Sequence, residues 1–453
     1  MDTKYFGTDG IRAAANTPPM TADLVMRVGQ AAGQVFKHTA PHGRPTVVIG
    51  KDTRLSGYMF EAALQAGFTS VGFYCLMVGP LPTPAVAVLT RSLRADLGVM
   101  LTASHNPFAD NGLKLFTPNG VKVTEQKVQQ IEHLIDNSSE IKLAKEERIG
   151  RVVRLEDAVG RYIEFVKTTL PKDFNLHGMR LVVDCAHGAA YRIAPRIFWE
   201  LGAQVIRLGC EPDGLNINRN VGATATDAMC KAVEQHGADV GIALDGDGDR
   251  LMMCDEKGRV IDGDHILGAM AGYMHNKGTL KGGGVVGTVM SNMGLEHSVR
   301  DKGLAFIRTK VGDHYVEEAM REHGYNLGGE SSGHIILQDY ATTGDGILSA
   351  LHVLAAMRYS GQRASQIRQS FTPWPMKMQN IRLPEGANAS KILEKKAVQK
   401  AIEKAEKNMG TQGRVLVRKS GTEPVIRVMV EAMQQEVMDQ QLDDLCAVIE
   451  KAF

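Results

Sequence analysis

The sequence of 453 residues is poor in the features that mark several large classes of protein. Only 6% of its residues are aromatic, and no apolar run is long enough to span a bilayer. The amino terminus, MDTKYFGTDGIR, lacks the apolar core of a signal peptide. These absences argue against a membrane protein and against an exported one. We therefore expect a cytoplasmic protein with no membrane partner.

The chain also lacks an excess of charge of either sign. Its 52 basic and 51 acidic residues give a formal net charge of +1. A protein that binds nucleic acid or an anionic membrane through a broad basic surface needs such an excess. We therefore expect no nucleic-acid partner, and any anionic ligand must be held by a local group of side chains.

Cysteine is scarce and scattered, with six residues and no CxxC pair. The cysteines lie at positions 75, 185, 210, 230, 254 and 446. This spacing argues against both a zinc site and a disulfide framework, and it favours a reducing compartment.

The length indicates several domains, because one ordinary core does not extend over so many residues. Three segments share a rhythm of strand, helix, strand, helix, strand and polar loop. That rhythm is typical of βαβ units and of parallel or mixed sheets. The three segments open with predicted strands at 45–51, 179–185 and 284–289.

After residue 371 the pattern changes to that of a small α+β module. Strands are predicted at 374–383, 414–418 and 424–431, and helices at 389–407 and 436–453. The predicted domains are 1–153, 154–254, 255–369 and 370–453. The predicted fold class is therefore α/β, with three tandem, topologically similar βαβαβ-type domains with mixed sheets and a C-terminal α+β domain.

Ser104 lies in the first of the polar loops. The apolar run 97–101 predicts a buried strand, and Pro107 prevents its simple continuation. Ligands of open α/β sheets bind at the carboxyl ends of strands, where a serine can act as a nucleophile. A serine that caps a turn is the commoner case. The adjacent His105 does not make a triad, because adjacency in sequence is not the geometry that a triad requires.

A second segment repeats the first. Residues 238–249, ADVGIALDGDGD, align without a gap with residues 95–106, ADLGVMLTASHN. The alignment places Asp247 opposite Ser104. The chain thus repeats one supersecondary unit and uses the same loop for different chemistry.

Three carboxylates alternate with glycines in this second loop, at Asp245, Asp247 and Asp249. Glycine permits the tight curvature that turns like charges toward one hard cation, and such a set favours Mg²⁺. A solvated acidic turn is the alternative. An EF-hand is disfavoured because Arg250 stands where that loop needs glycine, and because strands flank the loop.

Two further polar loops suit the binding of a phosphorylated sugar. Residues 418–424, RKSGTEP, together with Arg427, supply arginines, hydroxyls and a glycine-opened backbone that suit a phosphate. A charged hairpin tip is the alternative. Residues 328–334, GGESSGH, supply a carboxylate, hydroxyls and an imidazole that suit sugar hydroxyls.

Together these motifs resemble the α-D-phosphohexomutase family nearly end to end. The matching motifs are KYFGTDGIR at 4–12, TASHNP at 102–107, DGDGDR at 245–250, GESSGH at 329–334 and RKSGTEPVIRVMVE at 418–431. Other stretches, among them GKDTRLSGYM, GPLPTPAVA, GCEPDGLNIN and TKVGD, resemble the glucosamine branch of that family. Two residues depart from that branch. Ser331 stands where Gln or Asn is usual, and Ala13 stands where Gly is usual.

The resemblance implies a phosphoserine enzyme with four domains around a central cleft. Ser104 would carry the transferable phosphoryl group and would complete a Mg²⁺ site with Asp245, Asp247 and Asp249. The other catalytic residues would be Arg12, His105, Lys114 and Arg250. Lys114 and His105 are both candidates for the general base. The substrate-binding residues would be Glu330, Ser332, His334, Arg418, Ser420, Gly421, Thr422 and Arg427.

The implied reaction interconverts glucosamine 6-phosphate and glucosamine 1-phosphate through phospho-Ser104. The implied cofactors are one Mg²⁺ per active site and a hexose 1,6-bisphosphate, which is an activator and an intermediate that reorients in the cleft. The expected partner is a small-molecule phosphosugar substrate, and a homodimer is left open. The alternatives are the same chemistry on mannose or glucose phosphates, a phosphoserine-dependent sugar phosphatase, and a non-catalytic sugar-phosphate-binding protein.

Overall fold

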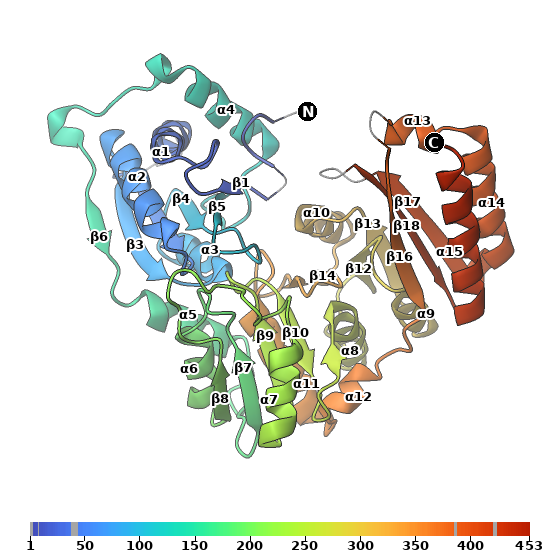
Figure 1. The fold of residues 1–453 in the computed structure, drawn as a ribbon. Helices are drawn as coiled ribbons and strands as arrows, with labels where there is room; N and C mark the ends of the chain where they lie inside the picture. Colours follow the sequence, from blue (N-terminus) through green and yellow to red (C-terminus); the bar gives the residue numbers. More distant parts are fainter. Residues whose placement is uncertain (1–2, 8, 38–43, 385–386, 420–423) are drawn as a thin grey trace. The chain divides into compact units, whose positions relative to one another are not determined.

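The computed structural model describes residues 3–7, 9–37, 44–384, 387–419 and 424–453, drawn as a ribbon in Figure 1. These residues form four β-sheets. The chain divides into two compact units, one of Met1–Met290 with Leu304–Ser370 and the other of Ser291–Gly303 with Phe371–Phe453. Within the described ranges, no helix combines the length and the apolar character needed to cross a membrane.

The first sheet has six strands in the order β1-β5-β4-β2-β3-β6. Their bounds are β1 Ile11–Ala14, β2 Thr46–Lys51, β3 Tyr74–Pro80, β4 Leu97–Leu101, β5 Asp110–Phe116 and β6 Val152–Arg154. Strand β5 runs antiparallel to both of its neighbours, and the other pairs are parallel. The helices of this region are α1 Ala22–Lys37, α2 Ser56–Ser70, α3 Thr83–Ser92 and α4 Glu125–Asp136, with short 3₁₀ turns at Ser138–Glu140 and Glu146–Arg148.

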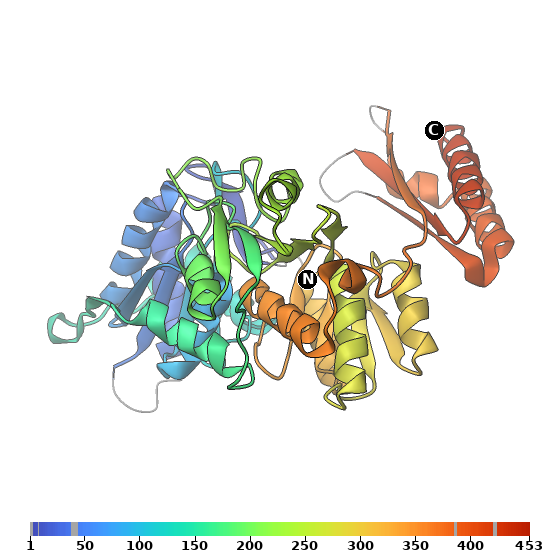
Figure 2. The ribbon, with the colours of Figure 1, turned by 90° about the horizontal axis from the view of Figure 1, so that it is seen from below.

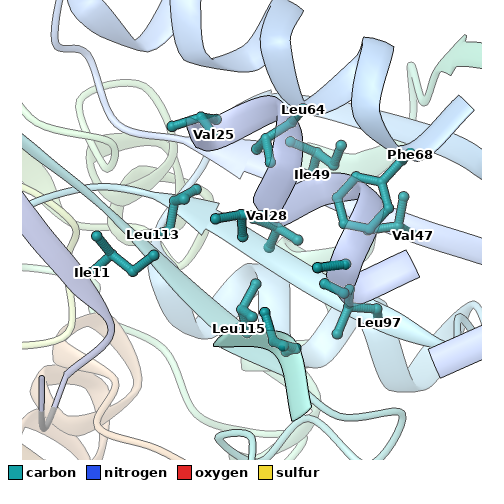
Figure 3. Packing of buried hydrophobic residues seen from close by; sticks show 14 of the residues in the cluster. Ile11, Val25, Val28, Val47, Ile49, Leu64, Phe68, Leu97, Leu113 and Leu115 are labelled. Atoms are coloured by element: carbon teal, nitrogen blue, oxygen red, sulfur yellow. The ribbon is translucent and has the colours of Figure 1, made fainter. Parts of the chain in front are cut away.

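The core of this sheet explains why its central strands are nearly continuous apolar runs. All five residues of β4 are buried, as are five of the six residues of β2. Parallel strands covered by helices bury both faces and therefore lack the alternation of half-exposed strands. Figure 3 shows Val47 and Leu97 of the sheet beside Val28 and Phe68 of the helices. This packing gives the loop after β4 a rigid base.

The second and third sheets repeat the order of the first. The second is β11-β10-β9-β7-β8, and the third is β13-β12-β14-β15. Their strands are β7 Arg180–Asp184, β8 Gln204–Leu208, β9 Val240–Leu244, β10 Leu251–Cys254, β11 Val260–Ile261, β12 Gly284–Thr288, β13 Ala305–Thr309, β14 Leu327–Gly329 and β15 Ile335–Leu337. In each of the three sheets, three parallel strands are followed by a polar loop and an antiparallel return strand. The predicted domain-scale repeat is therefore present in the fold.

Helices connect these strands. They are α5 Ala158–Thr168, α6 Ile193–Glu200, α7 Asp227–His236, α8 Gly263–Asn276, α9 Met293–Asp301, α10 Asp313–His323, α11 Gly346–Ser360 and α12 Ala364–Arg368. Although α9 lies between β12 and β13 in sequence, its residues belong to the same compact unit as the C-terminal region. There, the Asn292 side chain exchanges hydrogen bonds of 3.0 and 2.9 Å with the backbone of Trp374.

The C-terminal region is a three-stranded antiparallel sheet covered by helices. The sheet has the order β16-β18-β17, with β16 Met376–Arg382, β17 Gly413–Lys419 and β18 Val425–Ala432. Figures 1 and 2 show α14 Lys396–Met409 and α15 Gln435–Glu450, both red, on one face of it. The single helix predicted at 389–407 is wrong. It is two helices, α13 Ala389–Leu393 and α14, because Lys395 adopts an extended conformation between them.

Candidate active site

The three polar loops predicted to carry chemistry lie at equivalent places in the three sheets. Ser104 follows β4, Asp245 follows β9 and Glu330 follows β14, in each case before the antiparallel return strand. The alignment of Ser104 with Asp247 therefore corresponds to a true topological equivalence. Since these residues all belong to one compact unit, their side chains can be compared directly.

Ser104 is buried and directed at the acidic loop. The backbone of Ser104 has a left-handed φ of 49°. Its Oγ donates a hydrogen bond of 2.6 Å to Oδ2 of Asp245. Nδ1 of His105 lies 3.4 Å from the same Oγ. The amide of Ser104 donates to Oγ1 of Thr102 at 2.9 Å. The serine hydroxyl thus lies beside a carboxylate of the predicted metal loop.

The three aspartates of that loop converge. Asp245, Asp247 and Asp249 are buried, and each offers a carboxylate oxygen within 4.8 Å of the others. Nζ of Lys114 donates to Oδ2 of Asp247 and to Oδ2 of Asp249, at 2.9 Å each. Oγ1 of Thr83 donates to Oδ2 of Asp247 at 2.6 Å.

Burial and mutual repulsion dominate the electrostatics of these groups. Burial, then the neighbouring Asp249 and Asp247, raises the pKa of Asp245 well above its usual range. Burial also acts to raise the pKa of Asp249, but Lys114, His334 and Arg250 together outweigh it and hold this pKa well below its usual range. Burial acts to lower the pKa of Lys114, and the attraction of Asp247 and Asp249 raises it instead. The loop therefore carries more negative charge than one lysine balances.

The donor set fits a divalent cation. Oδ1 of Asp247 and Oδ1 of Asp249 are buried, and neither has a hydrogen-bond partner among the described residues. Buried carboxylate oxygens without partners, at short mutual distance, are hard ligands of the type that Mg²⁺ takes. The EF-hand alternative is excluded, because strands flank the loop. Glu256, at the twelfth position counted from Asp245, accepts a hydrogen bond of 2.6 Å from Ser365 instead of facing the triad. The loop is an acidic triad that can bind a metal.

Two predicted arginines lie near this triad. Arg12 forms an ion pair with Asp9, and its Nε is buried with no hydrogen-bond partner in the described part of the chain. The backbone amide of Arg250 donates to Oδ1 of Asp245 at 3.1 Å. Burial acts to lower the pKa of Arg250, but Asp245 and Asp249 raise it overall. Both cations therefore lie beside carboxylates, Arg12 beside Asp9 and Arg250 beside Asp245 and Asp249.

His105 differs from these groups, because its pKa is lowered. Burial, and then the positive charges of Arg250 and Arg12, lower it to about 4. The ring is therefore neutral at pH 7. A neutral imidazole beside Oγ of Ser104 can accept a proton, but a pKa this low makes it a weak base.

The sugar loop lies next to the acidic triad. Oε1 of Glu330 accepts from the amide of Gly312 at 3.0 Å, and Oγ of Ser332 donates to Oε2 of Glu330 at 3.3 Å. Nδ1 of His334 is 3.8 Å from Oδ1 of Asp249. The amide of Gly344 donates to Nε2 of the same ring at 3.1 Å. The structure thus brings the three predicted sugar-loop residues together beside the triad.

The predicted phosphate nest is described only in part. Arg418 of β17 and Arg427 of β18 are directly opposite one another across the sheet. Ser420, Gly421 and Thr422 lie outside the described residues. The two arginines provide neighbouring cations at the end of a β-hairpin.

Sequence reasoning missed several polar residues of the site. The clearest is Lys122, whose Nζ is 2.6 Å from Oδ1 of Asp9 and also pairs with Asp313. Asp313, Glu317 and His334 form a second group of side chains with ligand atoms close together. Asp9 and Asp313 stand in motifs that carried the resemblance, whereas Lys122 stands in no motif and looks in the sequence like a surface lysine.

Comparison with known families decides the classification. Four phosphoglucomutase/phosphomannomutase domain families match in order, namely α/β/α domain I at residues 3–142, domain II at 160–258, domain III at 262–373 and the C-terminal domain at 378–448. The chain belongs to the phosphoglucomutase/phosphomannomutase family. The family indicated by the motifs is thus confirmed, and so is the fold class of three α/β domains and a C-terminal α+β domain.

Curated members of the family match over nearly the whole length. The phosphoglucosamine mutase of Rhodospirillum rubrum is 54% identical over 447 residues, which are 99% of this chain and 98% of the relative. That of Parvibaculum lavamentivorans is 54% identical over 450 residues, 99% of each chain. The similarity extends across all four domain families.

Solved structures share the fold. A family protein from Burkholderia thailandensis superimposes with a TM-score of 0.80 at 23% identity, covering 100% of this chain and 98% of that one. An N-acetylphosphoglucosamine mutase from Aspergillus fumigatus, solved with GlcNAc-6P and magnesium, gives a TM-score of 0.66 at 19% identity, covering 100% and 96%. At such identities the likeness concerns the architecture.

Proposed function

We propose that this protein is an isomerase that interconverts glucosamine 6-phosphate and glucosamine 1-phosphate through a phosphoryl group on Ser104. The observation that carries this proposal is the Oγ of Ser104, 2.6 Å from Asp245 in a buried acidic triad. The 54% identity to curated phosphoglucosamine mutases supports the substrate.

In the forward direction, the first half-reaction begins at the free O1 of glucosamine 6-phosphate. In the reverse direction it begins at the free O6 of glucosamine 1-phosphate, whose O1 carries the phosphate. The bond between phosphorus and Oγ of Ser104 breaks as a bond from phosphorus to O1 forms. The proton of O1 leaves to a base, and Oγ regains a proton. Glucosamine 1,6-bisphosphate results.

The residues of the site suit this transfer, which depends mainly on position and on neutralised charge. Arg12 and Arg250 would stabilise negative charge on the moving phosphoryl group. Mg²⁺ held by Asp245, Asp247 and Asp249, with a phosphate oxygen on Ser104, would supply further neutralisation. Lys114 and His105 remain the candidates for moving the proton, since both lie within the site.

The second half-reaction needs the opposite phosphate at Ser104. The bisphosphate would reorient so that its original 6-phosphate returns to Oγ, leaving glucosamine 1-phosphate. Glu330, Ser332 and His334 would hold the sugar in both orientations. The residues proposed to bind the phosphate that is not transferred are Arg418, Ser420, Gly421, Thr422 and Arg427. A hexose 1,6-bisphosphate would also restore a dephosphorylated Ser104.

A coupled assay tests the proposal. Wild type and Ser104→Ala are given glucosamine 6-phosphate, Mg²⁺ and a catalytic amount of hexose 1,6-bisphosphate, and glucosamine 1-phosphate is measured. We expect turnover by the wild type and none by the variant. Mannose and glucose phosphates are compared in the same assay, and faster turnover of either would overturn the substrate assignment. Net release of inorganic phosphate would indicate a phosphatase instead.

A further inference from the structure

Arg54 lies buried behind the Ser104 loop and binds its backbone. The side chain has no exposed surface, and its guanidinium donates to four carbonyl oxygens of the loop. Those oxygens belong to Ser104 at 3.1 Å, Asn106 at 2.8 Å, Asp110 at 2.9 Å and Pro107. A fork of fixed donors of this kind defines the path of the loop.

Asp52 holds Arg54 and the loop together from the same side. Its Oδ2 accepts from Nε of Arg54 and from Oγ1 of Thr102, at 2.8 Å each. Thr102 in turn accepts from the amide of Ser104. Residues of the first sheet region thus bind both the amide of Ser104 and the carbonyl oxygens of the loop.

Asn218 approaches the same loop from a different part of the chain. It lies between β8 and β9, and its Nδ2 donates to the carbonyl oxygens of Ser104 at 2.9 Å and of Asn106 at 3.0 Å. These are the two oxygens that Nη2 of Arg54 also binds. Each of the two carbonyls therefore has one donor from the first sheet region and one from the second.

The backbone around Asn218 ties it to the acidic loop. Its amide donates to the carbonyl of Ala186 at 2.8 Å, and the amide of Ala189 donates to the carbonyl of Gly246 at 2.8 Å. A Cβ on Gly246 would stand 2.5 Å from the Ser104 carbonyl oxygen and 2.8 Å from Nδ2 of Asn218. The acidic loop, Asn218 and the Ser104 carbonyl are thus in direct contact.

We propose that Asn218 is a positioning residue for phosphoryl transfer, whose amide fixes the Ser104 loop against the acidic loop. This inference rests on the proposed function. Its two hydrogen bonds fix the carbonyls of Ser104 and Asn106, while the left-handed backbone of Ser104 directs Oγ toward Asp245. Both half-reactions use the same Oγ, so one misplaced serine slows both.

The size of the effect follows from the sensitivity of transfer reactions to geometry. A displacement of about 1 Å in a reacting group can cost on the order of 10²-fold in rate. Asn218 has no hydrogen bond to the sugar loop among the described residues. Its loss is therefore expected to lower kcat far more than it raises KM.

Asn218→Ala, Asn218→Asp and Asn216→Ala form a matched set. Asn216 lies in the same loop, buried, and its side chain bonds only to Glu211 and Asp213 among the described residues. We expect Asn218→Ala to lower kcat about 10- to 100-fold with KM changed less than about threefold. Asn218→Asp keeps the shape but turns a carboxylate toward two carbonyl oxygens, so we expect it to lower kcat further. Asn216→Ala should retain kcat.

Two readouts separate positioning from mere stability. The rate at which hexose 1,6-bisphosphate phosphorylates Ser104 should fall in parallel with kcat in both Asn218 variants. The melting temperature should fall by a similar amount in Asn218→Ala and Asn216→Ala. Unchanged kcat in the Asn218 variants, or an equal loss of kcat in Asn216→Ala, would overturn the inference. A wild type that turns over no hexose phosphate would instead overturn the proposed function.

Discussion

The loop after β4 and the loop after β9 occupy the same place in two repeated units, yet they bury different side-chain chemistry. The Ser104 loop is held from outside, by the donors of Arg54 and Asn218 on its carbonyls. In the acidic loop, three buried carboxylates face one another, and two of them accept hydrogen bonds from Lys114. The backbone of the acidic loop is also bound from outside, by the amides of Ala189, Thr83 and Gly346. The two loops therefore differ mainly in the charge that they bury.

The comparison shows how one fold unit acquires two chemical roles. The repeat places each loop at the end of a buried strand before an antiparallel return strand. Which chemistry results depends on the side chains, a hydroxyl at Ser104 and carboxylates at Asp245 to Asp249. The proposed transfer requires that the two loops stay in register, and the contact at Gly246 is where they meet.

Removing a carboxylate from the acidic loop should have the largest effect on activity. Asp245→Asn removes the charge and one oxygen of the carboxylate that accepts from the Ser104 hydroxyl and the Arg250 amide, and it leaves the proposed metal site with two carboxylates. We expect activity to fall on the order of 10²- to 10³-fold. Activity is measured with increasing Mg²⁺, and Asp227→Asn, on the exposed start of α7, is the control. Full activity at ordinary Mg²⁺ would contradict the metal assignment.

The two candidates for proton transfer can be separated next. Lys114→Ala leaves Asp247 and Asp249 without their buried counter-charge, whereas His105→Ala removes a neutral ring with a pKa of about 4. We therefore expect the lysine variant to lose about 10²-fold or more in kcat, and the histidine variant clearly less. Steady-state kinetics of both variants decide this. A greater loss in His105→Ala would contradict this order and would favour His105 as the group that moves the proton.

Filling the contact between the loops should have an intermediate effect. Gly246→Ala places a Cβ against the Ser104 carbonyl, so one loop must shift from the other. We expect kcat to fall about tenfold or more, with a loss of about 1–3 kcal/mol in the free energy of unfolding. Gly160→Ala in α5 meets nothing within 4 Å and serves as the control. A Gly246→Ala enzyme with wild-type kcat would show that the loops need no fixed register.

The smallest effect on activity is expected from a change that alters the pH dependence of the free energy of unfolding. Burial, then the charge of Asp313, raises the pKa of Glu317 from 4.5 to about 7. The native state therefore binds this proton more tightly than the unfolded state, and its contribution to stability is lost as the pH rises from about 4.5 to about 7. Glu317→Gln removes that loss. The variant should gain about 2–3 kcal/mol in the free energy of unfolding, relative to wild type, between pH 4.5 and 8.

Denaturant unfolding at several pH values measures this difference. Glu318→Gln is the matched control, because Glu318 is the adjacent and exposed residue of α10. A difference between wild type and Glu317→Gln that stays constant with pH would contradict the raised pKa.

Much of the fold was predictable from the sequence, because buried parallel strands give apolar runs that need no tertiary information. The apolar run at 97–101 forms β4 Leu97–Leu101, and the repeated segment at 238–249 forms β9 and its loop. The return strands β5 and β15 were not predicted, and β10 was predicted only as a strand that flanks the acidic loop. They follow the polar loops that end the predicted repeated units, and each pairs with the strand just before its loop.

The site was predictable where residues stand in motifs and not where burial gives them their role. Three alternating aspartates with intervening glycines favour a cation site from the sequence, but Lys122 looks like a surface lysine. Arg54 and Asn218 stand in the stretches GKDTRLSGYM and GCEPDGLNIN, yet neither stretch says what these two side chains bind. Their importance comes from the groups that the fold places against them, such as four loop carbonyls at Arg54. The domain boundaries, and the roles given to the site residues, stay predictions.

The central claim is that Ser104 carries the phosphoryl group, and phosphoenzyme transfer tests it most directly. The dephosphorylated protein is incubated with Mg²⁺ and a hexose 1,6-bisphosphate, and its intact mass is measured before and after a chase with glucosamine 6-phosphate. We predict the gain of one phosphoryl group, located on Ser104 by peptide analysis, and its loss during the chase as glucosamine 1,6-bisphosphate forms. Turnover of glucosamine 6-phosphate with no phosphate on Ser104, or equal turnover by Ser104→Ala, would contradict the account.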